Sequence, residues 1–373
     1  MDENITELQQ RVSGLEKQLA ELQRQNQEYK KDNDTMLQAI RNLYGINSET
    51  MNQISEILTN QATLDMNQTT LDITQGVIRV RCANLRYELF DPKVKREGYH
   101  FPVIINTQET IDEIIKNRKS MARFGDGEFA QIIKVNRHKF QKLDDRLGRR
   151  LEEVLHSHDP DVLIAIANNY GSLQDYTEAA ADAIRIYMST DDTREQHMKL
   201  LEHDRVYYDA YMSRPYVMYR DWMTEMPGKR FAHLKEIWKD RELIIVEGAQ
   251  TRMGVGNNLL EGAKDIKRIL APATSSFDRY DDVLKASLQY AKKDTLFLVA
   301  MGPAAGVLAY DLALEGYQAI DIGHIDLEYE WFLAGEGKRV AVPYKYNNEL
   351  EGDDDAMELH DPVYEGQILA SFQ

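Results

Sequence analysis

Residues 295–323 read TLFLVAMGPAAGVLAYDLALEGYQAIDIG, and this stretch decides the fold class. It contains two short apolar runs of strand length, 295–302 and 318–323, separated by a helical stretch at 304–316. A continuous apolar strand, a helix and a second apolar strand are typical of a parallel sheet that is covered on both faces. The stretch therefore predicts an α/β protein with a Rossmann-like, mostly parallel sheet.

The same alternation extends upstream of this stretch. Apolar runs predict further strands at 163–168, 243–248 and 266–272, and the segments 256–265 and 280–293 predict helices. Sheets of this kind bind ligands in the crevice outside the carboxyl ends of their strands. Residues that directly follow predicted strands are therefore the first candidates for a functional site.

The composition excludes several classes of partner. The chain has 373 residues, with 62 acidic against 45 basic side chains and a net charge of −17. Such a charge disfavours general binding to nucleic acid or to anionic membranes. The single cysteine, Cys82, fits a reducing compartment, and no apolar run reaches the roughly 20 residues of a membrane helix. We expect a cytoplasmic protein without a membrane span and without a nucleic-acid partner.

The N-terminal segment 1–45 carries a coiled-coil pattern. Its apolar residues and asparagines fall at heptad positions a (Ile5, Val12, Leu19, Asn26, Asn33, Ile40) and d (Leu8, Leu15, Leu22, Tyr29, Met36, Leu43). Branched residues at a with leucine at d favour two parallel strands, so the segment predicts self-association as a homodimer. The alternative is a helix that packs on its own domain. Residues 46–98 are expected to be helix or linker, and 99–373 to form the α/β domain.

Two carboxylates stand close together in RFGDGE, residues 123–128. In an extended segment, Asp126 and Glu128 would point to the same side and aim at one point in space. Such a pair is useful if a divalent cation lies between the two side chains, and tolerable if both are exposed to water. A third reading is that Asp126 only caps a helix that starts near Glu128.

Two predicted strand ends carry further candidates. After the strand 243–248 come Arg252 and the turn Gly254-Val255-Gly256-Asn257, an arrangement that receives phosphate when a helix follows. An ordinary tight turn is the alternative, because the third glycine of a dinucleotide fingerprint is missing. After the strand 318–323, His324 is expected to point into the crevice and Asp326 to cap a helix.

Six segments together resemble the GT-D type glycosyltransferases. They are RFGDGE (123–128), SRPY (213–216), VEGAQTRMGVGNNLL (246–260), ILAPATSSFDRYDDVL (269–284), GPAAGVLAYDLALEGYQAIDIGHIDLEYEWF (302–332) and KYNNE (345–349). That family includes bacterial enzymes that use UDP-sugars to extend glycans on serine-rich repeat adhesins. The resemblance covers roughly residues 100–350 and leaves the coiled-coil segment outside. It implies transfer of a sugar from a UDP-sugar to an acceptor, expected to be a protein-linked glycan.

The resemblance also implies roles for the candidate residues. The family's Asp-x-Glu metal motif matches Asp126 and Glu128, which are expected to hold Mn²⁺ or Mg²⁺, with His324 as a further ligand. Diphosphate oxygens are expected to meet arginine side chains and the glycine-bearing turn (Arg123, Arg214, Arg252, Gly254, Gly256, Asn257). Arg123 has the alternative of holding Asp126 in place. An inverting transfer uses a base that accepts the proton of the attacking hydroxyl, whereas a retaining transfer need not. Such a base is expected among five carboxylates, with Asp326 and Glu328 preferred over the other three (Glu247, Asp321, Glu349).

Two other functions remain open at this level. A nicotinamide-dependent oxidoreductase would use the same broad fold, but it predicts a complete glycine fingerprint followed by an acidic residue at the end of the second strand. A non-catalytic coiled-coil scaffold with a nucleotide-binding domain is the second alternative. A scaffold has no need of two neighbouring carboxylates together with three arginines.

Overall fold

The computed structural model describes residues 2–44, 48–96, 101–136, 141–347 and 357–373. It divides into two compact units, Met1–Cys82 and Ala83–Gln373. None of the helices within these described ranges has the length and apolar character that crossing a membrane requires.

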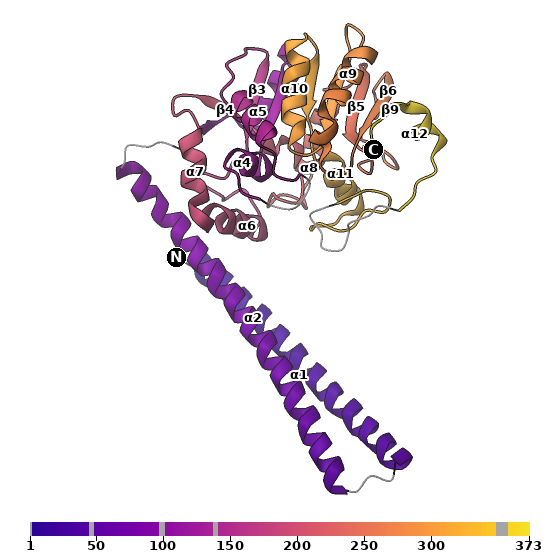
Figure 1. Cartoon of the computed structure of the whole chain (residues 1–373). Helices are drawn as coiled ribbons and strands as arrows, with labels where there is room; N and C mark the ends of the chain where they lie inside the picture. The colour runs from indigo at the N-terminus through magenta and orange to yellow at the C-terminus, as the bar shows by residue number, and fades with distance from the viewer. Residues whose placement is uncertain (1, 45–47, 97–100, 137–140, 348–356) are drawn as a thin grey trace. The chain divides into compact units, whose positions relative to one another are not determined.

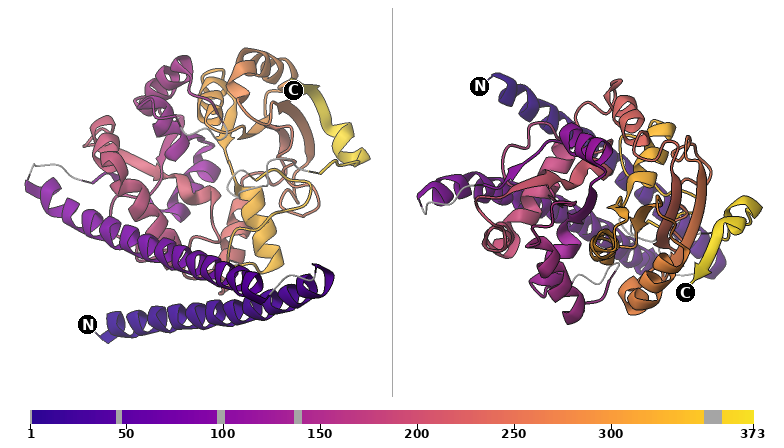
Figure 2. Two further views of the ribbon diagram at one scale, coloured as in Figure 1. Left: turned by 60° about the horizontal axis from the view of Figure 1, so that its bottom comes forward. Right: turned by 90° about the horizontal axis from the view of Figure 1, so that it is seen from above.

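The N-terminal unit is built from two long helices, α1 (Asp2–Tyr44) and most of α2 (Ser48–Arg96). They lie side by side within the chain and run in opposite directions, as Figures 1 and 2 show, and Asn26 Nδ2 of α1 lies 3.5 Å from Met66 Sδ of α2. Leu37 and Met51 are buried in this pairing. The sequence did not predict α2 as the partner of α1, and the parallel dimer predicted from residues 1–45 stays a prediction.

The second unit holds one parallel sheet. Within the described residues its nine strands have the order β1-β4-β3-β2-β8-β7-β5-β6-β9, and all paired neighbours are parallel. The strands are β1 (Val103–Ile104), β2 (Ser120–Phe124), β3 (Val162–Ile166), β4 (Val206–Asp209), β5 (Glu242–Gly248), β6 (Asp265–Ala271), β7 (Leu296–Ala300), β8 (Gln318–Asp321) and β9 (Ile368–Ser371). The predicted fold class is confirmed, and the five predicted strands correspond to β3, β5, β6, β7 and β8.

Helices cover both faces of the sheet. They are α3 (Thr107–Asn117), α4 (Asp126–Ile132), α5 (Asp145–Leu155), α6 (Glu178–Ser189), α7 (Thr193–Leu200), α8 (Met226–Lys235), α9 (Tyr280–Tyr290), α10 (Ala304–Leu314), α11 (Ile325–Ala334) and α12 (Pro362–Gln367), with short 3₁₀ turns η1 (Thr190–Asp192), η2 (Ala210–Ser213) and η3 (Ser276–Arg279). Helix α10 packs on β2, β7 and β8 and contacts α5 and α9 on the same face (Figure 1), while α3 packs on β4 and contacts α8. Right-handed crossovers place α3 and α8 on the opposite face. The strands between these layers are buried, and all five residues of β7 are inaccessible or nearly so.

The helix predicted at 256–265 is wrong, because turns fill this segment before β6. Gly254 and Gly256 both have positive φ, at 75° and 79°. The Asn257 side chain accepts a hydrogen bond from Leu259 N at 2.9 Å. Such local side-chain bonds offer the backbone an alternative to a helix. The arrangement of a glycine turn followed by a helix, on which the predicted phosphate cradle depended, is therefore absent at this strand end.

The order of the strands also fixes where a ligand site can form. The strands β2 and β8 are neighbours and pair through Met121 and Ile320. From β2 the chain continues to β3 on one side, whereas from β8 it continues to β9 at the opposite edge of the sheet, so the direction of the connections reverses between them. A crevice forms at such a reversal, outside the carboxyl ends of the strands. The segments that follow β2 and β8 therefore meet at one place, although they are about 200 residues apart in the sequence.

Candidate active site

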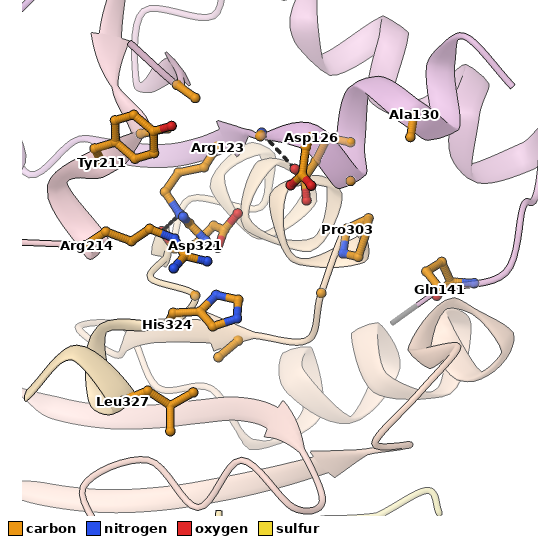
Figure 3. Close-up of a pocket in the computed structure, with 18 of the residues that line it drawn as sticks. Arg123, Asp126, Ala130, Gln141, Tyr211, Arg214, Pro303, Asp321, His324 and Leu327 are labelled. Carbon is orange, nitrogen blue, oxygen red and sulfur yellow. Dashed lines mark hydrogen bonds and ion pairs between the residues drawn. The ribbon is translucent and has the colours of Figure 1, made fainter. Parts of the chain in front are cut away.

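A cavity of about 450 Å³ lies at the carboxyl ends of the central strands. Much of its polar lining comes from the segment after β2, the segment after β8, and the turn that contains η2. Figure 3 shows Arg123, Asp126, Arg214, Asp321 and His324 around this cavity. Six of the residues predicted for the site thus line it together: Arg123, Asp126, Glu128, Arg214, His324 and Asp326.

Arg123, at the end of β2, is held by the segment after β8. Its Nη2 lies 2.6 Å from Asp321 Oδ1, its Nε donates to Asp321 O at 2.9 Å, and its Nη1 donates to Ser213 Oγ at 2.7 Å. Burial raises the pKa of Asp321, and the charge of Arg123 counteracts only part of this effect. Arg123 therefore positions Asp321 and the η2 turn, whereas the sequence predicted a contact with Asp126 or with phosphate.

Gly323 makes this arrangement possible. A Cβ atom at this position would lie 2.1 Å from Arg123 Nη2, and the φ of Gly323 is +47°. Only glycine tolerates both the close approach and the left-handed backbone without cost.

Asp126 and Glu128 lie in the first turn of α4, not in an extended segment as predicted. Gly125 is the N-cap residue, Asp126 is the first helical residue, and Glu128 Oε2 accepts from Gly125 N at 2.7 Å. The reading of Asp126 as a cap is therefore also wrong, because Glu128 makes the capping contact. Helical geometry still leaves both carboxylates on the cavity wall, with Asp126 exposed and Glu128 half-buried.

Ionisation of the Glu128 carboxyl group costs free energy in the folded protein. Loss of solvent, followed by the nearby Asp321 carboxylate, raises the pKa of Glu128 to about 7. The hydrogen bond from Gly125 N and the charge of Arg123 act in the opposite direction but do not balance these effects. A cation beside Glu128 would favour the ionised carboxylate.

Arg214 and Glu328 form a buried pair behind the cavity. Arg214 Nη1 lies 3.8 Å from Glu328 Oε1, and Glu328 Oε2 accepts from the backbone N–H groups of Tyr216 and Val217 at 3.2 and 3.1 Å. Glu328 is fully buried and is not part of the cavity lining, whereas Arg214 is. The structure thus gives Glu328 the role of positioning the SRPY segment, and Arg214 with it.

Asp326 is the centre of a second buried network. Its Oδ1 accepts from Gly254 N at 2.9 Å and from Asn257 Nδ2 at 2.8 Å, and its Oδ2 lies 2.6 Å from Lys345 Nζ. Asp326 does not cap α11 as predicted, because the helix begins at Ile325 with His324 in the N-cap position. Gly254 and Asn257 are not among the lining residues, and their connection to the cavity is the pair of hydrogen bonds that they donate to Asp326.

The remaining candidates lie away from the cavity. Arg252 donates to Tyr344 O at 2.5 Å and to Met357 O at 2.7 Å, and neither Arg252 nor Gly256 is among the lining residues. Glu247 is buried and paired with Arg268, at 2.5 Å between Oε1 and Nη1. Glu349 lies outside the described residues.

Sequence reasoning missed several polar residues of the cavity wall, among them Asn169 and Tyr211. Both line the cavity, and Tyr211 Oη donates to Asn169 Oδ1 at 2.6 Å. Asn169 directly follows the predicted strand 163–168, so the rule that strand ends carry the site would have found it. Tyr211 stands in η2 and carried no such signal.

The carboxylates and His324 of the cavity wall determine which kind of divalent-cation site could form there. Within the part of the chain that the structure describes, no three His, Cys, Asp or Glu side chains are grouped so as to hold a metal ion. Mg²⁺ in nucleotide-dependent enzymes is held by one or two carboxylates, and substrate phosphates and waters complete its coordination. Asp126 and Glu128 both line the cavity, so they fit a site in which two carboxylates hold the cation and substrate phosphates and waters complete its coordination.

An α/β protein with a cavity at its central strand ends has the arrangement in which ligands bind outside the carboxyl ends of the strands. Comparison with known proteins defines the class further. Residues 121–350 match the family model of the glycosyltransferase GT-D fold, and the chain belongs to this family.

Two curated relatives are streptococcal. The probable glycosyl transferase Gly of Streptococcus gordonii is 34% identical over 272 residues, which are 72% of this chain and 38% of that protein. The glycosyltransferase GlyD of Streptococcus pneumoniae serotype 4 is 34% identical over 263 residues, which are 70% of this chain and 31% of that protein. The chain therefore spans only about a third of the length of these relatives.

Solved structures show the same fold. A glycosyltransferase of Streptococcus sanguinis with a domain of unknown function 1792 superposes with a TM-score of 0.67 at 32% identity, over 73% of this chain and all of that one. A second structure of this kind of domain, described as having a distinct glycosyltransferase fold, gives a TM-score of 0.65 at 32% identity, over 72% of this chain and 95% of that one.

Proposed function

We propose that this protein transfers a sugar from a UDP-sugar to a hydroxyl group of an acceptor, in a reaction that depends on Mn²⁺ or Mg²⁺. The observation that carries this proposal is the cavity at the ends of β2 and β8, where Asp126 and Glu128 share the lining with Arg214 and His324. Membership of the GT-D family supplies the reaction class. The UDP-sugar donor and a protein-linked glycan as acceptor follow from the resemblance to enzymes that extend adhesin glycans.

In this proposal Asp126 and Glu128 hold the divalent cation. Hard carboxylate oxygens are the ligands that Mn²⁺ and Mg²⁺ prefer, and His324, which lines the same cavity, is a further ligand suited to Mn²⁺. When bound, the cation supplies positive charge that stabilises the diphosphate as it leaves.

Arg214, which lines the same cavity as the two carboxylates, binds the diphosphate oxygens. Its guanidinium group has a planar fork that matches a phosphate, and Glu328 behind it fixes its direction. Arg123 contributes indirectly, because its donors are engaged by Asp321 and Ser213. In a chain with a net charge of −17, such local arginines are what makes binding of an anion feasible.

Asp326 is the proposed base, since it is the one of the two preferred carboxylates that lines the cavity. The acceptor hydroxyl oxygen attacks the anomeric carbon, and the bond from this carbon to the diphosphate oxygen breaks. The hydroxyl proton passes to the Asp326 carboxylate, and UDP leaves. Lys345, Asn257 and Gly254 N hold the carboxylate in a fixed direction during this transfer.

The test is release of UDP from a panel of UDP-sugars in the presence of Mn²⁺ and an acceptor glycan. Asp126→Asn should reduce turnover at least 100-fold. Asp145→Asn is the matched control, because Asp145 is likewise exposed and is the first residue of its helix, α5, but lies outside the cavity lining. Full activity of Asp126→Asn, or full wild-type activity in excess EDTA, would contradict the proposal. Tight binding of NADH with no binding of UDP would favour the oxidoreductase instead.

We further propose that the chain self-associates through its N-terminal helices. The heptad pattern of residues 1–45 and the long helices α1 and α2 support this proposal.

A further inference from the structure

One face of α2 carries exposed apolar side chains at every seventh residue. They are Ile57, Leu64, Leu71, Ile78 and Leu85, and their exposed fractions are 65%, 62%, 50%, 54% and 59%. We call these five residues the α2 stripe. A strict seven-residue repeat of large apolar residues keeps one seam of a helix against a partner helix. An exposed apolar row of this kind marks an interaction surface.

The α2 stripe lies on the far side of α2 from α1. Met51, Ile54, Leu58 and Met66 are partly or fully buried and form the side of α2 that packs within the hairpin. At 100° of rotation per residue, the stripe is roughly 150° around the helix from these residues. A further helix can therefore pack on the stripe without displacing α1.

The charges beside the stripe indicate which helix fits. Asp65 and Asp72 flank the stripe in its N-terminal half, whereas Arg79 and Arg81 flank it in its C-terminal half. Charges next to an apolar seam set the partner and its orientation. If a second α2 packed in parallel, it would place like charges side by side. A second α2 that runs in the opposite direction places the acidic half of one copy beside the basic half of the other.

We propose that the α2 stripe is the self-association surface of this protein, and that it binds the α2 stripe of a second copy in antiparallel orientation. The contact is isologous, with a two-fold axis near Leu71, so each copy contributes the same residues. This assigns self-association to a different helix, and to the opposite orientation, from the parallel coiled coil that residues 1–45 predict. The inference does not depend on the proposed transfer reaction, because the stripe lies outside the cavity lining.

The first test is the mass of the full chain by sedimentation equilibrium at micromolar concentration. Wild type should have twice the chain mass of 43.1 kDa, and the double substitution Leu64→Lys with Leu71→Lys should reduce it to one chain mass. Thr63→Lys with Thr70→Lys is the matched control, because both threonines are exposed on α2 but roughly 100° away from the stripe. This control should remain dimeric. A monomeric wild type, or a dimeric Leu64→Lys/Leu71→Lys variant, would overturn the proposal.

The second test measures the orientation in the full chain. A spin label is attached to Asn60→Cys, an exposed position roughly 60° around the helix from the stripe, in a Cys82→Ser background, which removes the only native cysteine. With the axis near Leu71 and a rise of 1.5 Å per residue, the two labels of an antiparallel dimer lie about 33 Å apart along the helices. In a parallel dimer they lie less than about 20 Å apart. The longer distance supports the antiparallel contact, and the shorter distance refutes it.

Discussion

Replacing Glu128 by Gln should make the protein more stable at alkaline pH while it removes a proposed metal ligand. Gln also accepts a hydrogen bond, so it keeps the capping contact with Gly125 N. What the substitution removes is a carboxylate whose ionisation costs free energy in the folded protein, because loss of solvent and the Asp321 carboxylate oppose it.

The magnitude follows from the raised pKa. The pKa of Glu128 rises from an ordinary value of 4.5 to about 7, and each unit corresponds to about 1.4 kcal/mol. Between these two values the folded state binds more protons than the unfolded state, so the wild-type free energy of unfolding falls as the pH rises through this window. The stabilisation by the protonated carboxyl group is complete below pH 4.5 and is lost above about pH 7. The advantage of Glu128→Gln over wild type should therefore grow to about 3 kcal/mol near pH 8.

The assay is urea unfolding in EDTA at several pH values, followed by tryptophan fluorescence because Trp238 and Trp331 are buried. Glu109→Gln serves as control, since Glu109 stands at the third position of helix α3 but is exposed. Asp209 also has a raised pKa, about 6, but it is present in every variant and cancels in the difference. A Glu128→Gln variant that is no more stable than wild type near pH 8, or a difference that does not change with pH, would refute the reasoning.

Three further predictions concern the residues around the cavity and in the core. Arg214→Ala should weaken UDP binding about 10- to 100-fold, measured by calorimetry, because a charged hydrogen bond to phosphate contributes about 1.5–3 kcal/mol. Arg252→Ala is the control, because Arg252 lies outside the cavity, and it should change the UDP affinity little. Equal losses in both variants would show that Arg252 contacts the ligand. Gly323→Ala should lower the melting temperature and abolish turnover, since its Cβ would meet a guanidinium nitrogen at 2.1 Å; a variant with wild-type stability and activity would disprove this constraint. Arg268→Met should cost about 3–5 kcal/mol in urea unfolding because it leaves the buried Glu247 carboxylate uncompensated, and Glu247→Gln in the same chain should recover much of the loss.

The sequence was sufficient for the elements whose signal is local. Continuous apolar runs located the central strands β5, β7 and β8, because a strand buried on both faces has no polar positions to interrupt the run. The edge strands β1 and β9 carried no such signal, because apolar runs of two to four residues are too short to be recognised as strands.

The sequence predicted which residues line the candidate site, but it did not predict which of them contact one another. Strand ends and the family resemblance together identified Asp126, Arg214 and His324, which all line the cavity. The pairing of Arg123 with Asp321 joins residues 198 positions apart, and it depends on β2 and β8 being neighbours in the sheet. A pattern of residues along the chain does not determine this neighbour relation.

The conformation of the RFGDGE segment was the clearest error of sequence reasoning. Two carboxylates at i and i+2 suggested an extended segment, but Glu128 stands three residues after Gly125 and makes a capping contact there. The spacing of a capping box and the spacing of a same-side pair in a strand both occur in this motif. Only the position of the end of β2 decides between them.

The measurement that tests the central proposal most directly is the affinity for UDP with and without Mn²⁺, determined by calorimetry on the full chain. In wild type and in Asp145→Asn, Mn²⁺ should strengthen UDP binding at least 10-fold, because a cation held by Asp126 and Glu128 would offset the negative charge of the diphosphate. In Asp126→Asn this strengthening should disappear while the fold persists. UDP affinity that is the same in Mn²⁺ and in EDTA, or an Asp126→Asn variant that responds to Mn²⁺ like wild type, would contradict a metal-dependent nucleotide-sugar site at this position.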